Sequence, residues 1–243
     1  YMSNHNILTL DKLSLHDFDT EADLIPLLTP EDEEEMANEE LPNSLAILPL
    51  RNTVLFPGVV IPITAGRDKS IKLINDANAA GKVIGVVAQK DEDVEDPKRD
   101  DIHSIGTVAQ ILRVLKMPDG NVTVILQGKK RFEITKVISE EPYLNALVKE
   151  VPEKRPSKTD TEFGAIIESI KEMAIRIIKE SPNIPTEATF AIKNIESQSF
   201  LINFVSSNMN LDVKEKQSLL MMNILKERAL TTLRYMNTEL QKL

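Results

Sequence analysis

Between residues 44 and 151, apolar positions recur in short runs that are typical of strands, with one helical interruption. Leu45–Leu50 and Val59–Ile63 predict two strands joined by a turn, because prolines confine such segments to the edges or bends of a sheet. Asp68–Ala80 has helical spacing and ends before Gly81. The other expected strands are Lys82–Gln89, Ile102–Lys116, Val122–Gln127, Arg131–Ser139 and Leu144–Val151. Many short strands with one helix predict a barrel-like, mostly antiparallel sheet.

From residue 152 the apolar period lengthens to about 3.6, which indicates helices. The expected helices are Thr161–Glu180, Phe190–Ile195, Ser199–Ser206, Val213–Met221 after an N-cap at Asp212, and Leu225–Leu243. The last helix reaches the end of the sequence without a glycine stop, so we expect the natural polypeptide to continue. The fold class is therefore α+β, with a β-domain at 44–151 and an all-α bundle at 152–243 that ends in a long helix.

Charge is distributed unevenly along the 243 residues. Residues 1–43 hold 12 acidic side chains and one basic side chain, Lys12, which gives a net charge of −11, whereas 44–151 and 152–243 each carry +1. Acidic segments with few large apolar groups are typically disordered, so we expect residues 1–43 to be a largely disordered leader. The apolar residues between Ile7 and Leu15 leave open a short helix or a docking peptide.

The residue types that catalysis requires are missing or scattered. The chain has no cysteine, which excludes disulfides and thiolate metal sites and fits a reducing compartment such as the cytoplasm. The Gly-Lys pairs at Gly81 and Gly128 lack the upstream glycine and the following hydroxyl of a phosphate-binding loop. His5, His16 and His103 are far apart, and we expect His103 to be a lone exposed imidazole. We therefore expect no catalytic residue and no metal ligand, and no apolar run is long enough for a membrane span.

A series of spaced motifs carries a resemblance to a known family. They are LPLRNTVLFPGVVIPI (Leu48–Ile63), GRDKS (Gly66–Ser70), IGVVAQKD (Ile84–Asp91), IGTVAQI (Ile105–Ile111), the turn Met117–Gly120, VILQGKKRFEI (Val124–Ile134), PYLNALV (Pro142–Val148) and DVKEKQSLL (Asp212–Leu220). No single motif is specific, but their order and spacing together resemble the N-terminal substrate-recognition domain of the Lon family of ATP-dependent proteases. The resemblance covers about Leu45 to Leu243.

The resemblance implies a PUA-like β-domain and a non-catalytic role in recognition. It implies unfolded or damaged proteins as substrates, adaptor proteins as further partners, and a homo-hexamer in the full-length bacterial, cytoplasmic protein. The ATPase domain with its ATP and magnesium, and the protease domain with its serine–lysine dyad, have no counterpart in these residues. The chain alone is therefore expected to bind protein segments without hydrolysing ATP or peptides.

The first candidate binding site is Arg67, Asp68 and Lys69, at the junction of a strand and a helix. Asp68 can cap the helix, and Arg67 and Lys69 can then point outward. The simpler interpretation is a capping residue between solvated charges, which is how most such runs behave. The alternative is a contact site for substrates or adaptors, which the family resemblance supports.

The second candidate binding site is Leu55, Phe56 and Pro57, a possible apolar loop tip. Exposed clusters of aromatic and aliphatic side chains mark binding sites. Phe56 folded into the core is the more common arrangement for such a residue, and both interpretations stay open at this point.

Two other functions remain open. PUA-like folds also occur in RNA-modifying proteins, so an RNA-binding module is the first alternative. The near-neutral charge of 44–151 and an aromatic content of 4% argue against it, because RNA-binding surfaces favour basic grooves and stacking rings. The second alternative is a stand-alone protein with this domain and no ATPase, which the unterminated last helix disfavours.

Overall fold

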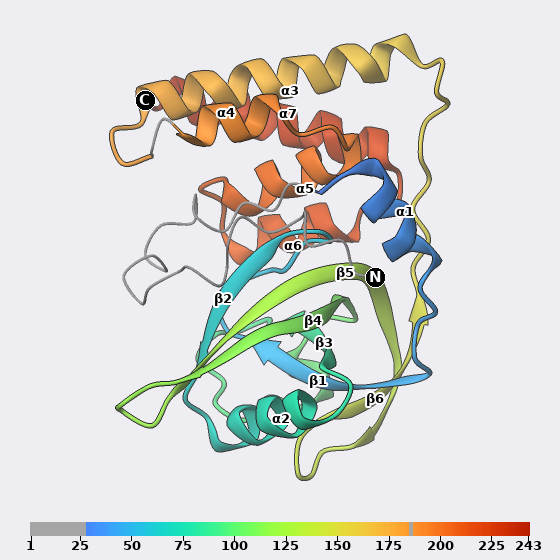
Figure 1. Cartoon of the computed structure of the whole chain (residues 1–243), viewed down its shortest axis with the longest axis vertical. Coiled ribbons are helices and arrows are strands. Elements are labelled where there is room, and N and C mark those ends of the chain that lie inside the picture. The colour runs from blue at the N-terminus through green and yellow to red at the C-terminus, as the bar shows by residue number, and fades with distance from the viewer. Residues whose placement is uncertain (1–27, 185–186) are drawn as a thin grey trace.

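A mixed sheet of six strands forms the first part of the fold (Figure 1). The computed structural model describes residues 28–184 and 187–243. The strands are β1 (Ser44–Leu50), β2 (Val60–Ala65), β3 (Val83–Ala88), β4 (Ile105–Lys116), β5 (Val122–Ser139) and β6 (Asn145–Glu150). Their order is β2-β5-β4-β3-β1-β6, and β5 pairs with β6 as well, which closes a ring. The β1–β3 pair is parallel and the other pairs are antiparallel, so the predicted barrel-like, mostly antiparallel sheet is confirmed.

β5 is one strand of 18 residues, so the expectation of two strands at Val122–Gln127 and Arg131–Ser139 is wrong. Thr107 of β4 faces Arg131, and Ala109 faces Gly128, so β5 carries one extra residue at this point. Such a bulge bends a strand without ending it. The first half of β5 pairs with β2 and the second half with β6, which is how a single strand both extends and closes the sheet.

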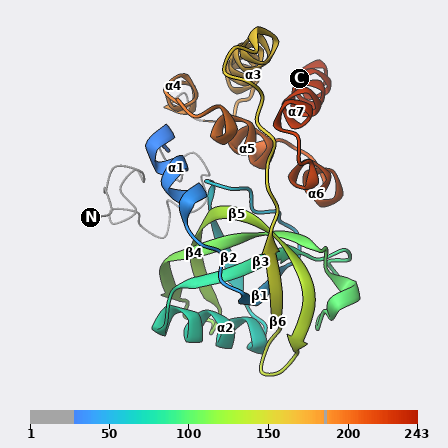
Figure 2. The same ribbon diagram turned by 90° about the vertical axis from the view of Figure 1, so that its right-hand side faces the viewer.

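One helix, α2 (Asp68–Ala79), connects β2 to β3 and lies against the end of the barrel that faces away from the other helices (Figure 2). Leu73 and Ile74 are its buried apolar residues. The segment between β3 and β4 contains a short 3-10 helix, η4 (Arg99–Asp101), and β4 begins at Ile105 instead of Ile102. Ile102 lies before β4 and forms only an isolated bridge with Gln89.

The helical part follows β6 and contains α3 (Thr161–Glu180), α4 (Glu187–Lys193), α5 (Gln198–Asn208), α6 (Val213–Met221) and α7 (Leu225–Gln241). α3 and α6 have the predicted bounds. Each begins directly after an N-cap, because Asp160 and Asp212 accept N–H groups of the first turn at 2.9 and 2.7 Å. α4 begins before the expected Phe190, and α7 ends two residues before Leu243. None of the described helices is both long and apolar enough to cross a membrane.

Part of the acidic leader is helical. α1 (Pro30–Asn38) starts with a capping box, in which Asp32 and Thr29 bond each other's backbone N–H at 3.2 Å. The helix lies beside the junction between the barrel and the helical part (Figure 2). The expected disorder therefore does not hold for residues 28–43. Residues 1–27, with the apolar cluster from Ile7 to Leu15, lie outside the described residues.

The barrel and the helical part share a core. One buried apolar cluster runs from Phe56 and Val59 of the β-domain to Phe200 and Leu220 of the helices. A second, smaller cluster is built mainly from the ring strands, with Phe132 among its members. The two parts are therefore packed against each other, and the exact boundary near residue 151 stays a prediction.

Candidate functional site

A groove of about 880 Å³ lies where β1, β2 and the first turn of α2 meet. Its walls include the end of β1 from Ile47 to Leu50, the end of β2 from Pro62 to Ala65, and residues 95–98 of the segment after β3. The whole predicted motif Gly66–Ser70 lines it. The motif Gly66–Ser70 therefore lies on a concave surface, although the roles of its individual residues differ from those expected.

The groove lies between two strand edges that no other strand of the described sheet covers. β6 pairs with β1 only as far as Ala46, and β2 is the outermost strand of the sheet. Each edge carries a proline that lines the groove, Pro49 on β1 and Pro62 on β2. Because proline has no N–H group, both edges are poor templates for the addition of a further strand. The groove therefore offers side-chain surface more than backbone hydrogen bonds.

Arg67 turns into the structure, so the expectation that it points outward is wrong. Its Nη1 donates to Gln89 Oε1 at 2.8 Å and to the Glu95 carbonyl at 3.1 Å, and its Nη2 donates to the Pro49 carbonyl at 3.1 Å. Burial lowers the pKa of the Arg67 guanidinium. Arg67 itself holds the N-cap position, and Asp68 is the first helical residue instead of the cap. Arg67 thus ties α2 to β1 and to the segment after β3.

Lys69 belongs to an exposed ion-pair network on the rim of the groove. Its Nζ lies 3.1 Å from Asp96 and 2.8 Å from Glu141, while Lys98 lies 3.1 Å from Asp96 and 3.2 Å from Glu140. The hydrogen bonds to Glu141 and Asp96 raise the pKa of Lys69, and those from Lys98 and Lys69 lower the pKa of Asp96. Solvent screens such pairs, so breaking them costs little free energy.

Leu55, Phe56 and Pro57 do not form an exposed loop tip, so this candidate site is wrong. Phe56 is 0% exposed and Leu55 2%. The segment passes between β5 and α5, where a Cβ on Gly128 would lie 2.3 Å from the Phe56 carbonyl oxygen. The simpler interpretation holds, because the aromatic ring is part of the shared core.

The half-buried apolar side chains of the groove were not among the predicted site residues. Pro62, Ile63 and Tyr143 line it and remain partly open to solvent. The Tyr143 hydroxyl donates to Asp76 Oδ2 at 2.9 Å, and burial, followed by this hydrogen bond, raises its pKa. The strand pattern placed Ile63 on a sheet, but it gave no sign of which strand edges would stay uncovered.

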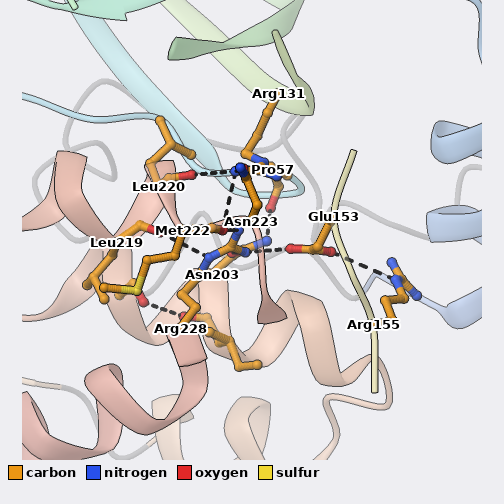
Figure 3. A network of polar contacts seen from close by, with 12 residues as sticks. Pro57, Arg131, Glu153, Arg155, Asn203, Leu219, Leu220, Met222, Asn223 and Arg228 are labelled. Atoms are coloured by element: carbon orange, nitrogen blue, oxygen red, sulfur yellow. Dashed lines mark hydrogen bonds and ion pairs between the residues drawn. The ribbon is translucent and has the colours of Figure 1, made fainter. Parts of the chain in front are cut away.

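Two buried arginines join the barrel to the helical part (Figure 3). Arg131 of β5 donates to the Leu220 carbonyl at 2.9 Å, to Asn223 Oδ1 at 3.0 Å and to the Pro152 carbonyl at 3.1 Å. Burial lowers the pKa of Arg131 to about 10, and the nearby positive charge of Arg228 adds to this effect. Arg131 therefore connects β5 to the linker after β6 and to the segment between α6 and α7.

Arg228 of α7 is 0% exposed and completes this connection. Its Nη1 lies 2.7 Å from Glu153 and 3.1 Å from Asn203 Oδ1, and its Nη2 donates to the Met222 carbonyl at 2.7 Å. Arg228 was not predicted to be buried or functional, although its spacing from Leu225 places it on the apolar face of the helix. The pair of arginines fixes how the groove-bearing barrel sits on the helices.

Among the described residues, no cluster of His, Asp and Glu could hold a metal ion. His103 is partly buried instead of fully exposed, and burial lowers its pKa.

Comparisons with known proteins identify the family of this chain. Residues 44–238 match the family model for the ATP-dependent protease La (LON) substrate-binding domain. A Lon protease of Flavobacterium johnsoniae is 80% identical over 242 residues, which is 100% of this chain and 30% of that protein. A Lon protease of Cytophaga hutchinsonii is 48% identical over 93% of this chain and 28% of its own length. The chain thus spans about 30% of the length of these relatives.

Solved structures show the same fold. The N-terminal domain of a Mycobacterium avium complex Lon protease matches with a TM-score of 0.66 and 22% identity, over 80% of this chain and 98% of that one. A Lon N-terminal domain protein from Xanthomonas campestris matches with a TM-score of 0.55, 18% identity and coverage of 79% and 98%. The order of motifs, the shared fold and the family match lead to one assignment: the chain belongs to the Lon protease family and comprises its N-terminal substrate-binding domain.

Proposed function

We propose that the groove beside β1, β2 and α2 binds apolar segments of unfolded or damaged proteins. The observation that carries this proposal is a groove of about 880 Å³ that opens between two proline-bearing strand edges. Pro62, Ile63 and Tyr143 provide apolar contact, and the rim carries both charges. Exposed apolar surface with a polar rim is typical of sites that bind other proteins.

The geometry also accounts for the expected weakness and breadth of this binding. Peptides that add to a sheet edge gain affinity from main-chain hydrogen bonds. Here Pro49 and Pro62 offer no N–H group, and Arg67 already donates to the Pro49 carbonyl. A bound segment must therefore be held mainly by burial of its apolar side chains, which is non-directional. The site accordingly discriminates poorly between sequences and favours any accessible apolar stretch.

The role in the whole protein is part of the same proposal. The chain would present substrates, and adaptors where these exist, to the ATPase and protease domains of a cytoplasmic Lon protease. ATP and magnesium would be used in those domains, and a homo-hexameric assembly would supply six grooves. Several weak sites on one particle raise the effective affinity without any new contact. Hydrolysis of ATP or of a peptide by this chain above a buffer blank would contradict its non-catalytic role.

A pair of threonines allows a matched test of the groove. Thr64 of β2 is exposed and lines the groove, and Thr135 of β5 is exposed outside it. Each hydroxyl makes one hydrogen bond, to Thr123 at 3.2 Å and to the Leu147 carbonyl at 3.1 Å. We expect Thr64→Glu to weaken binding by about tenfold, because a bound apolar segment would bury the new carboxylate, and Thr135→Glu to have little effect.

The measurement is fluorescence anisotropy with a labelled protein that is kept unfolded by reduction and alkylation of its cysteines. Thermal unfolding of both variants provides the control for stability. Equal binding by wild type and Thr64→Glu would rule out the groove as the binding site. Equal loss in the two variants would show that added negative charge, and not its position, is responsible.

A further inference from the structure

A second concave surface lies between the barrel and the helical part. α1 packs over it and forms one wall of the cleft that remains. This cleft has a volume of about 290 Å³ and is lined by residues of α1, β5, the linker after β6 and α5. It is separate from the groove beside β2, so the following proposal does not depend on the function proposed for that groove. α1 also precedes residue 44, where the family match begins.

Two apolar anchors hold the α1 segment against the other walls of this cleft. Leu28 is 4% exposed and Met36 is 9% exposed, and both belong to the shared core. A Cβ added to Gly58 would lie 3.0 Å from Leu28 Cδ2 and 2.8 Å from Phe200 Cδ2, so the Leu28 side chain fills the space that this glycine leaves. The opposite face of α1, with Glu31, Glu34 and Glu35, is exposed.

Charge complementarity holds the polar side of the segment. Glu33 forms an ion pair with Arg155 and accepts a hydrogen bond from Ser197. At the other end, Lys129 lies 3.5 Å from Glu39, and Lys130 donates to the Glu39 carbonyl. Glu150 and Glu153 also line the cleft and pair with Lys130 and Arg155. The cations that contact the α1 segment, together with the apolar residues beneath it, fit an acidic amphipathic helix.

The cleft also contains a polar group that α1 leaves unused. The Ser199 hydroxyl is buried, lines the cleft and has no hydrogen-bond partner among the described residues. Buried polar atoms normally have partners, so this hydroxyl is available to a ligand that fills the cleft differently. α1 has nine residues, and helices this short are marginal without tertiary contacts. α1 therefore depends on its contacts with the rest of the chain.

We propose that the surface under α1 is a receptor for an acidic amphipathic helix of another polypeptide, and that α1 covers this surface in cis. The partner would carry a carboxylate three residues before a large apolar side chain, as Glu33 and Met36 do. It would have to displace α1, which is tethered next to the cleft by residues 39–43. A short tether gives an effective concentration in the millimolar range, so weak ligands would be excluded while α1 is docked.

Charge reversal on the two faces of α1 tests this proposal in the full chain. Glu33→Lys removes the ion pair with Arg155, whereas Glu34→Lys makes the same charge change on the exposed face. We expect faster amide hydrogen exchange at residues 30–38 in Glu33→Lys than in Glu34→Lys or wild type. A fluorescein-labelled peptide with the sequence of residues 28–41 should then bind Glu33→Lys at least about tenfold more tightly than either of the other two.

A second charge reversal tests the receptor side. Arg155→Glu in an otherwise wild-type chain should undock α1 by repulsion from Glu33 and should not bind the wild-type peptide, whereas the peptide that itself carries Glu33→Lys should bind it. The proposal is overturned if exchange and peptide affinity are the same in Glu33→Lys and Glu34→Lys, or if the peptide binds regardless of Arg155. Sedimentation velocity provides the remaining check. A wild-type dimer that Glu33→Lys abolishes would assign the cleft to α1 of a second copy and would overturn the foreign partner.

Discussion

Two charged clusters of this molecule are built in opposite ways. Around Arg131 and Arg228, two guanidinium groups are buried and donate mostly to backbone carbonyls and side-chain amides. Around Lys69 and Lys98, the partners are exposed carboxylates on two separate segments. The first cluster lies between the barrel and the helices (Figure 3), and the second lies on the rim of the groove.

The contrast separates a fixed part of the domain from an adaptable one. A buried guanidinium cannot exchange its partners for water, so its bonds hold the two parts in one arrangement. Exposed pairs exchange partners with solvent and salt at little cost. A groove that bound many apolar segments, as proposed, would need an adaptable rim, while the buried cluster would keep the barrel in one position on the helices.

The largest expected effect comes from the buried cluster. Arg228→Met keeps the start of the aliphatic chain but removes the guanidinium, which leaves the Asn203 oxygen without its donor and Glu153 without its buried partner. We expect the free energy of unfolding to fall by about 3–5 kcal/mol, as in other broken buried pairs. Urea denaturation measures this change. Arg234→Met, on the exposed face of the same helix, is the matched control, and an equal effect of both would refute the assignment.

Much of the fold could be predicted where local chemistry decides the structure. Asp160 and Asp212 are N-caps with a clear sequence signal, and the helices behind them have the predicted bounds. α1 was missed because the run of acidic residues resembles a disordered tail, although Thr29 and Asp32 have capping-box spacing. β5 was divided at Gly128 because a bulge and a strand end share the same local signal.

The site could be predicted only as a location. Gly66–Ser70 was placed correctly at a strand–helix junction, but the direction of Arg67 depends on Gln89, which lies 22 positions further along the chain. The same limit applies to Phe56, which is buried in a core that it shares with residues as distant in the sequence as Phe200. Local spacing cannot report contacts between distant segments, whereas it could have placed Arg228 on the buried face of α7.

A smaller effect is expected from the carboxylate partner of Arg228. Glu153→Gln keeps the shape and an acceptor oxygen but removes the charge that faces Arg228 at 2.7 Å. We expect a loss of about 1–3 kcal/mol in the free energy of unfolding, the usual contribution of a hydrogen bond to a charged group. Glu227→Gln, on an exposed position of α7, should change little in the same urea titration. A loss as large as that of Arg228→Met would show that the ion pair dominates over the carbonyl contacts.

The rim should respond less to substitution and more to salt. Lys69→Met removes two exposed ion pairs, so the shift of the urea midpoint should be smaller than that of Glu153→Gln. The difference from wild type should shrink between about 0.05 and 1 M NaCl, because salt screens exposed pairs. The Glu153→Gln difference should persist in high salt. A rim difference that is independent of salt would remove the distinction between the two clusters.

The smallest expected effect is a pH dependence of stability that comes from His103. This residue lies near the end of the segment that carries Asp96 and Lys98. Burial, with the charge of Lys90, lowers the pKa of His103 below its ordinary value of 6.5. The unfolded chain then takes up a proton that the folded chain refuses, so the contribution of His103 to stability is complete above pH 6.5 and declines as the pH falls toward the folded pKa. His103→Gln should remove this decline, measured as the difference in urea midpoint between the variant and wild type at pH 7.5 and pH 5.5. A difference that does not change with pH would show that the imidazole has the same pKa in the folded and the unfolded chain. His103 would then be as open to solvent as the ion pairs on the rim of the groove.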